Sequence, residues 1–170
     1  MKVITLKQPW ATLVAEGIKQ YEFRTWKTNY RGKILIHAGA GVDKKDMERF
    51  KGLNLDYPSK RIVAEVEIED CLELDDELNK KIINEKNIAY GSKYRTGYAW
   101  KLKNVRKIKS DEIINGKLGL WNYEKNKDID LNNLTLGLNK KIWWICPNGH
   151  EYYSLIANRV KGNGCPYCNG

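Results

Sequence analysis

Four potential metal ligands near the C-terminus constrain the fold of this chain more than any other feature of its sequence. Cys146 and His150 form one short pair, Cys165 and Cys168 form another, and 14 residues separate the pairs. Thiolate sulfur and imidazole nitrogen suit tetrahedral zinc, and two tight turns can bring the pairs together. Because protein ligands fill all four positions, the pattern predicts one structural zinc ion rather than a catalytic one. The alternative, free thiols in a tail, leaves this concentration of ligands unexplained.

The remaining cysteine, Cys71, ends a predicted strand and is expected to be a small buried apolar side chain. The N-terminal residues MKVITLKQPW lack the hydrophobic core of a signal peptide, and no stretch of about 18 apolar residues is present. We therefore expect a cytoplasmic protein without a membrane partner. In a reducing compartment, cysteines act as metal ligands or free thiols rather than as disulfides.

Residues 8–26 (QPWATLVAEGIKQYEFRTW) change from a helical to a strand pattern, and we call them the elbow. Apolar residues first recur at helical spacing, and a glycine then suits the helix end. Residues 21–26 alternate with period two, as in a strand. Lys19 is therefore expected at the junction, with Glu22 and Arg24 on one face of the strand. Such a group can bind or act on a small polar ligand. The alternative is a surface ion pair between Glu22 and Arg24.

Apolar patterns predict strands at residues 2–6, 33–37, 61–72, 98–102 and 105–108, and helices at 43–50 and 75–87. Residues 38–41 form a predicted glycine-containing loop, which is a weak candidate for phosphate binding. His37 before it is expected to be a hydrogen-bonded structural residue rather than a catalyst. Glu65, Glu67 and Glu69 share one face of the long strand, either as an acidic site or, as we expect, on a solvated surface.

Basic residues outnumber acidic ones, which gives a net charge of +9. Five of the nine residues at 101–109 (KLKNVRKIK) are basic. A basic surface of this kind favours a polyanionic partner, and nucleic acid is the commonest one. A lysine-rich solvated surface is the alternative.

Several ordered sequence blocks extend through residues 1–123: Gln-Pro-Trp-Ala, G-x-K-x-x-E-x-R-x-W, R-G-x-x-x-I-H-A, and the segments at 98–102 and 116–121. Together they resemble an ASCH domain. ASCH domains are similar to PUA domains, so the resemblance implies an α+β fold with a small β-barrel and flanking helices. It also implies an association with RNA and modified bases.

Residues 121–170 carry W-x-Y-x-x-N, W-W-x-C, C-x-x-G-H, Asn158-Arg159 and G-x-G-C-P-x-C. This segment is similar to one repeat of a treble-clef, zinc-ribbon-like family that often occurs beside nuclease domains. The resemblance implies a nucleic-acid-associated accessory module without chemistry of its own. We therefore expect two domains, 1–123 and 124–170, that share the segment at 121–123.

The favoured hypothesis is a nucleic-acid-binding protein, with RNA or DNA as its partner and one base in a pocket at the elbow. Aromatic side chains would stack on the base, and a carboxylate would accept from its amino group. The basic run would hold the backbone through its phosphates. The predicted pocket residues are Lys19, Glu22, Arg24 and Trp26, and the predicted backbone contacts are Lys101, Lys103, Arg106 and Lys107.

The second hypothesis is a hydrolase, because some ASCH proteins resemble ribonucleases and others resemble amidohydrolases acting on acetylated cytidine. In the small amidohydrolases the elbow reads G-x-K-x-x-T-x-R, so Lys19 matches the catalytic lysine and Glu22 replaces the threonine. These two residues are the catalytic candidates if the protein is an enzyme. The negative charge tends to raise the pKa of Lys19 and argues against amide hydrolysis. We favour binding over catalysis without excluding an enzyme, and we expect no small-molecule cofactor.

A third hypothesis is a protein-interaction adaptor that uses the aromatic pairs of the last 30 residues. The alternative, which we favour, is that these side chains form the small core of the zinc module. The pairs are Trp143 with Trp144, and Tyr152 with Tyr153.

Overall fold

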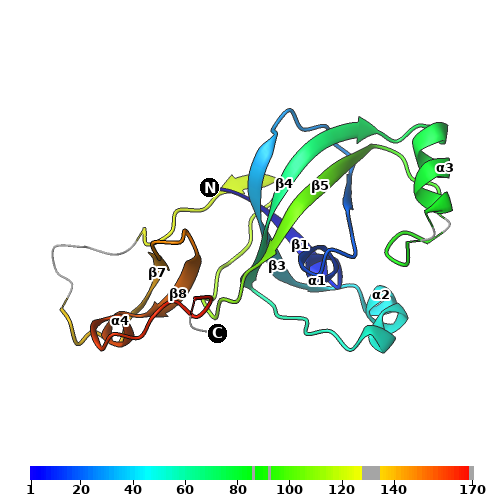
Figure 1. Ribbon diagram of the computed structural model, residues 1–170. Helices are drawn as coiled ribbons and strands as arrows, with labels where there is room; N and C mark the ends of the chain where they lie inside the picture. The colour runs from blue at the N-terminus through cyan, green and yellow to red at the C-terminus, as the bar shows by residue number, and fades with distance from the viewer. Residues whose placement is uncertain (86, 92, 128–134, 169–170) are drawn as a thin grey trace.

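The structure is a computed structural model that describes residues 1–85, 87–91, 93–127 and 135–168. A strongly curved, six-stranded mixed sheet forms the larger part of the molecule (Figure 1). The strand order is β2-β5-β4-β3-β1-β6, and only the β1–β3 pairing is parallel among the described residues. The strands are β1 (Lys2–Gln8), β2 (Tyr21–Arg24), β3 (Gly32–Val42), β4 (Arg61–Glu73), β5 (Tyr98–Lys107) and β6 (Leu120–Asn122).

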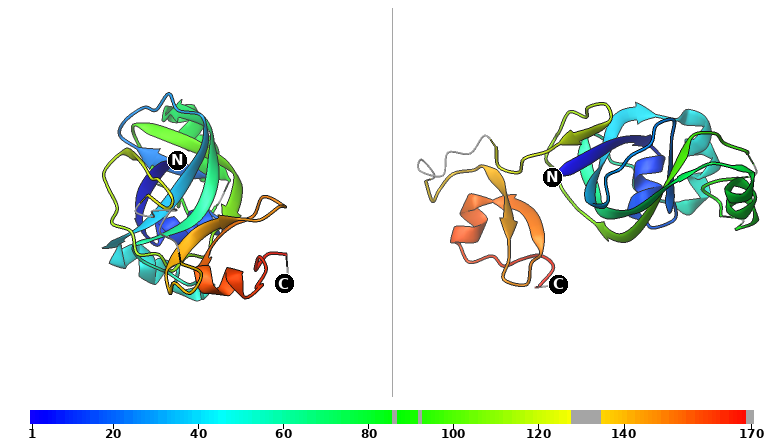
Figure 2. Two further views of the ribbon diagram at one scale, coloured as in Figure 1. Left: turned by 90° about the vertical axis from the view of Figure 1, so that its left-hand side faces the viewer. Right: turned by 90° about the horizontal axis from the view of Figure 1, so that it is seen from above.

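The helices of this part are short and lie around the sheet (Figures 1 and 2). They are α1 (Trp10–Ala15), α2 (Lys44–Arg49), the 3-10 helix η1 (Lys51–Leu53) and α3 (Asp76–Asn84). Asp43 and Asp75 cap α2 and α3 by accepting hydrogen bonds from backbone N–H groups in the first turn. The α+β class is therefore confirmed. Among the described residues no pairing joins the edge strands β2 and β6, so a closed barrel stays a prediction.

The main core lies between the sheet and α1. Leu13 and Val14 of the helix are fully buried, and the inward residues of β1, β3, β4 and β5 pack together with Val14. Gly17 follows the helix with a φ of +71°, a left-handed conformation that glycine adopts without strain. The chain then reverses into β2, as the elbow pattern predicts.

Two predicted boundaries are wrong because tertiary pairing extends the strands. Residues 38–41 lie within β3 rather than in a loop, since β3 pairs with β1 as far as Val42 opposite Gln8. Residues 98–108 hold one strand, β5, instead of two. Its pairing with β4 shifts register, and Asn104 there adopts a φ of +52°.

The zinc module consists of the hairpin β7 (Lys141–Ile145) and β8 (Glu151–Leu155), followed by α4 (Ile156–Val160). Neighbouring residues of a strand point to opposite faces, and this hairpin uses both. Trp144 and Tyr152 pack beside the cysteines. Trp143 and Tyr153 pack instead against the first domain, in a cluster that includes Val3. Only Trp144 and Tyr152 therefore form the expected core of the zinc module. Trp143 and Tyr153 instead pack at its contact with the first domain.

No helix in the described ranges is both long enough and apolar enough to cross a membrane.

Candidate ligand site and zinc centre

The four predicted metal ligands converge at one point of the zinc module. Their ligand atoms all lie within 4.8 Å of one another. The distance between the sulfurs of Cys146 and Cys168 is 3.8 Å, and Nδ1 of His150 lies 3.3–3.8 Å from the three sulfurs. With metal–ligand bonds of about 2.0–2.3 Å, a tetrahedral zinc ion requires ligand separations of this size. The residues therefore fit one structural zinc ion.

The local backbone prepares these residues to bind metal. Cys146 and Gly149 close the first turn with a hydrogen bond between N of Gly149 and O of Cys146, at 2.8 Å. Burial raises the pKa of the Cys146 thiol, but hydrogen bonds from the backbone at His150 and Asn148 outweigh it and lower the pKa to about 7. Zinc binds the thiolate form, so this environment favours the ligand state of Cys146.

At the elbow, Lys19, Glu22 and Arg24 form a connected charge group. Nζ of Lys19 pairs with Oε2 of Glu22 and also donates to the carbonyl oxygen of Tyr21 at 2.6 Å. Oε1 of Glu22 lies 3.1 Å from Nε of Arg24. Lys19 is 4% exposed and Glu22 is 8% exposed. The interpretation as a surface ion pair is therefore wrong for this group, because the carboxylate is buried between two cations.

The position of Lys19 lowers the pKa of its ammonium group. Desolvation by burial is the largest cause, and the neighbouring Glu22 acts in the opposite direction. The sequence correctly suggested that Glu22 raises this pKa, but it held no measure of burial. Burial decides the net direction, which the charge of Glu22 alone does not give.

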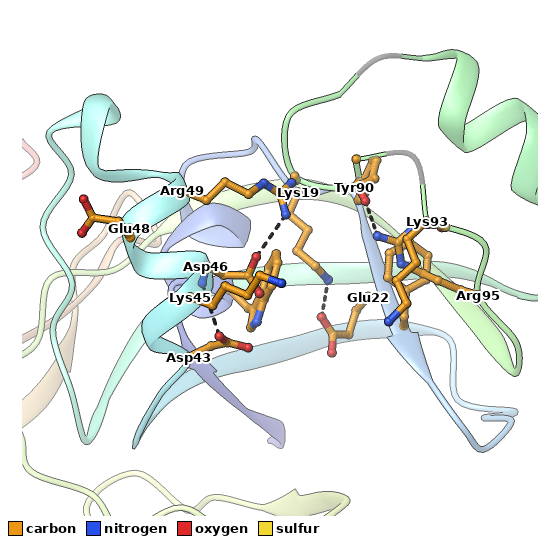
Figure 3. Close-up of a pocket in the computed structure, with 14 residues that line it drawn as sticks. Lys19, Glu22, Asp43, Lys45, Asp46, Glu48, Arg49, Tyr90, Lys93 and Arg95 are labelled. Carbon is orange, nitrogen blue, oxygen red and sulfur yellow. Dashed lines mark hydrogen bonds and ion pairs between the residues drawn. The ribbon is translucent and has the colours of Figure 1, made fainter.

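Lys19 and Glu22 meet at the floor of a cavity of about 1100 Å³, which we call the elbow cavity (Figure 3). One wall is α2 with Asp43 before it, and the opposite wall comes from residues 89–91, Lys93 and Arg95. Figure 3 shows these two walls facing each other across the Lys19–Glu22 pair. The cavity also has three aromatic lining residues, Trp10, Phe23 and Tyr90.

Tyr90 holds the second wall against the elbow. Its hydroxyl oxygen accepts hydrogen bonds from the backbone N–H groups of Gln20 and Tyr21, at 2.6 and 2.8 Å. Burial is the main cause that raises the pKa of Tyr90 to about 12, so the phenol stays protonated near neutral pH. Arg95 donates to the carbonyl oxygen of Tyr90 and lies 4.5 Å from the ring centre of Phe23.

A second hollow of about 730 Å³ adjoins the first, because Trp10 and Glu22 line both. We call it the glycine cavity, since Gly39, Gly41, Gly116 and Gly119 are among its lining residues. Arg24 belongs to this side, whereas Lys19 belongs to the elbow cavity. Glu22 therefore stands between the two cavities, with one cation on each side.

The structure thus brings together three of the four predicted pocket residues. Trp26 lines neither cavity; its ring lies 4.7 Å from that of Trp100 and it is 37% exposed. Sequence patterns did not identify Tyr90, Lys93 or Arg95. These residues lie in an irregular segment, and only the fold carries them to the elbow.

The basic run lies on β5, where its cations face carboxylates across the sheet surface. Cross-strand neighbours on one face approach closely, so Glu67 and Glu69 of β4 lie within reach of the β5 lysines. The ion pairs are Lys101–Glu69 at 2.7 Å, Lys103–Glu69 at 3.2 Å, Lys103–Glu67 at 3.6 Å, Arg106–Glu65 and Arg106–Glu151 at 3.3 Å, and Lys107–Glu16. Much of the positive charge of this run is therefore balanced locally. A role of these residues in nucleic-acid binding stays a prediction.

Two other residues that the sequence singled out have structural roles, although one differs from expectation. Glu65 is buried rather than solvated, and it pairs with Lys33 at 3.1 Å as well as with Arg106. Burial raises its pKa, but the two cations outweigh that effect and lower it. His37 is fully buried, with Nε2 at 2.9 Å from the carbonyl oxygen of Ile114 and Nδ1 at 3.3 Å from Oγ1 of Thr5. It is the hydrogen-bonded structural histidine that the sequence indicated.

Comparison with known proteins assigns both parts of the chain. A family model described as "ASCH domain" matches residues 4–112, and one described as "Probable Treble clef zinc finger domain" matches residues 118–170. Activating signal cointegrator 1 is 33% identical to this chain over 81 residues in Homo sapiens and 34% over 82 residues in Mus musculus. Each match covers 41% of this chain but only 14% of the relative.

Proposed function

This chain belongs to the ASCH domain family, and on that premise we propose that it binds nucleic acid and accommodates one unpaired base in the elbow cavity. The observation that carries the proposal is that aromatic side chains and a buried Lys19–Glu22 pair line the same cavity. A base offers a flat π-face for stacking and an edge that carries donors and acceptors. The elbow cavity offers a partner for each.

The floor of the elbow cavity supports recognition of a base edge. Glu22 is an acceptor for an exocyclic amino group, and Lys19 is a donor for a ring nitrogen or carbonyl oxygen. Their ion pair fixes both side chains before a ligand enters. A group that is already ordered loses less conformational entropy on binding.

The rim of the elbow cavity supports contact with phosphates. Lys45, Lys93 and Arg95 come from both walls. Two of the nearby carboxylates already have partners, because Asp46 pairs with Arg49 and Glu48 pairs with Lys51. Positive charge therefore prevails where the backbone of a bound strand would enter.

We also propose that the zinc module makes a second contact with the same nucleic-acid strand. The packing of Trp143 and Tyr153 against the first domain supports this role, because it gives the module a fixed place beside that domain. Two sites held next to each other can bind one nucleic-acid strand together more tightly than either site alone.

One observation favours hydrolysis as a second candidate function: the lowered pKa of Lys19 in a cavity. A neutral Nζ could take a proton from a water molecule that attacks an amide carbonyl, and the leaving nitrogen would then accept the proton. The pair with Glu22 opposes this role because it stabilises the charged ammonium.

The test is binding of fluorescent single-stranded RNA and DNA, with and without an acetylated cytidine, by wild type, Glu22→Gln and Lys19→Ala. Base-dependent binding that changes with Glu22→Gln supports the proposal. Identical base preferences for wild type and Glu22→Gln would reject the proposal that the base binds in the elbow cavity. Loss of the acetyl group over time, abolished in Lys19→Ala while binding persists, would assign the hydrolase instead.

A further inference from the structure

We infer that the glycine cavity is an anion-binding subsite. It holds a backbone phosphate of the nucleic acid whose base enters the elbow cavity. This inference rests on the proposed function and adds to it a place for the phosphodiester. It concerns three lysines to which no sequence motif assigned a role: Lys7, Lys60 and Lys117.

The charge of the glycine cavity differs from that of the basic run on β5. Four cations line it, and Glu22 is the only carboxylate among its described lining residues. Glu22 is already engaged by Lys19 and Arg24. By contrast, the ion pairs found in the described part of the chain include none with Lys7, Lys60 or Lys117. Positive charge is therefore uncompensated here, although the cations come from separate parts of the chain.

The fold brings these cations together through backbone and side-chain hydrogen bonds. The N–H of Ile114 donates to the carbonyl oxygen of Lys60 at 2.8 Å, which joins the start of β4 to the segment before β6. His37 contacts the carbonyl oxygen of the same Ile114. Trp121 donates from Nε1 to Oγ1 of Thr5 at 3.1 Å, which fixes the other end of that segment beside β1.

Gly116 sets how closely this segment approaches the sheet. A Cβ at this position would lie 2.8 Å from Oγ1 of Thr5 and 2.9 Å from Cε1 of His37, closer than real Cβ contacts. Only glycine therefore lets residues 115–119 lie so near to β1 and β3. Lys117 follows directly, and so the close approach places this residue among those that line the cavity.

A phosphodiester matches this arrangement. It is a compact anion, and lysine and arginine side chains are the usual partners of backbone phosphates. The shared lining residues Trp10 and Glu22 place the subsite next to the proposed base site. Arg24 then links the two, because its guanidinium pairs with Glu22 and also lines the glycine cavity.

The experiment compares the salt dependence of binding in two triple variants. The probe is a fluorescent single-stranded oligonucleotide of the type that wild type binds best, titrated between about 50 and 200 mM salt. The test variant is Lys7→Gln/Lys60→Gln/Lys117→Gln, in which all three residues are exposed. The charge-matched control is Lys33→Gln/Lys80→Gln/Lys81→Gln, whose residues are also exposed and line neither cavity.

Each phosphate contact to a single strand contributes about 0.7 to the slope of log K against log salt, so the test variant should lose about 2 units of slope. Over this range, wild type should lose roughly twentyfold more affinity than the test variant. The control should keep most of the wild-type slope. Leu118→Ala, an uncharged change beside Lys117, should also keep it.

Three results would overturn the inference. An unchanged slope in the test variant, with binding that still depends on Glu22, would reject the phosphate subsite and leave the proposed function intact. Equal slope losses in both triple variants would show a general surface effect. If wild type binds no oligonucleotide, the proposed function fails and the subsite fails with it.

Discussion

The indole Nε1 of Trp143 donates a hydrogen bond to a carboxylate oxygen of Glu112, at 2.7 Å. The hydroxyl of Tyr123 donates to the same oxygen at 2.5 Å. The Trp143 ring is 5% exposed and packs in a cluster with Val3 and Leu35. The zinc module therefore contributes a side chain to the core of the first domain.

Zinc removal should affect both parts of the chain. A chelator should unfold the residues from about 140 onward, because small zinc modules gain their folding free energy from the metal. The first domain should remain folded but lose stability, since Trp143 then leaves its cluster. Hydrogen exchange of residues 1–120 and of residues 140–168, with and without zinc, measures both effects. Unchanged protection of Val3 and Leu35 after chelation would show that the domains are independent.

Substitution of two neighbouring tryptophans should affect two different properties of the protein. Trp143→Ala should lower the free energy of unfolding of the first domain by about 3–5 kcal/mol, because it empties a buried site. Trp144→Ala should instead weaken zinc retention, since Trp144 packs beside Cys146 and Cys165. Chemical unfolding and zinc release with a colorimetric chelator measure the two effects. Equal outcomes for both variants would contradict the two-faced hairpin.

Glu22→Gln should change which base is preferred by an amount on the order of 1–3 kcal/mol, because it replaces an acceptor oxygen with a donor. It should also reduce stability by about 1–3 kcal/mol, since the buried Lys19 loses its partner. Glu67→Gln is the matched control at a half-buried position of β4 that lines neither cavity. A competition assay across four homopolymers measures the preference, and an effect of equal size in the control would assign it to general charge.

Lys19 should make stability rise with pH in the alkaline range. Its pKa is lowered in the folded state relative to the ordinary value of 10.5, so between the two values the unfolded chain binds more protons. The free energy of unfolding therefore increases with pH in that window and levels off above it. The difference between wild type and Lys19→Met should follow this course in urea unfolding. A constant difference across the window would mean that the pKa is not lowered.

The sequence predicted the parts of the site that depend on local spacing. The zinc ligands were found because two tight turns fix their positions, and the elbow was found because its period changes between Gly17 and Tyr21. The burial of Lys19 and Glu22 was not predicted. A strand pattern shows which residues share a face, but it does not show that α2, residues 89–91, Lys93 and Arg95 will enclose that face.

The surface charges illustrate the same limit. Along the sequence, Lys101 and Lys103 form a basic run, but in space each lysine lies beside a carboxylate of β4. Lys7, Lys60 and Lys117 show no pattern along the sequence and still converge on one cavity. The distribution of charge along the sequence therefore did not show where positive charge lies uncompensated in the fold.

The position of β1 between β3 and β6 has a consequence for the order in which the protein folds. Residues 2–4 pair with residues 120–122, so this pairing joins positions that are far apart in the chain. Contacts of such separation form slowly, because a long loop must close first. Synthesis proceeds from the N-terminus, so Val3 becomes fully buried only after Trp121 and then Trp143 have been synthesised and have packed against it. At this side of the sheet, one of the first strands to be made is among the last to be fully enclosed.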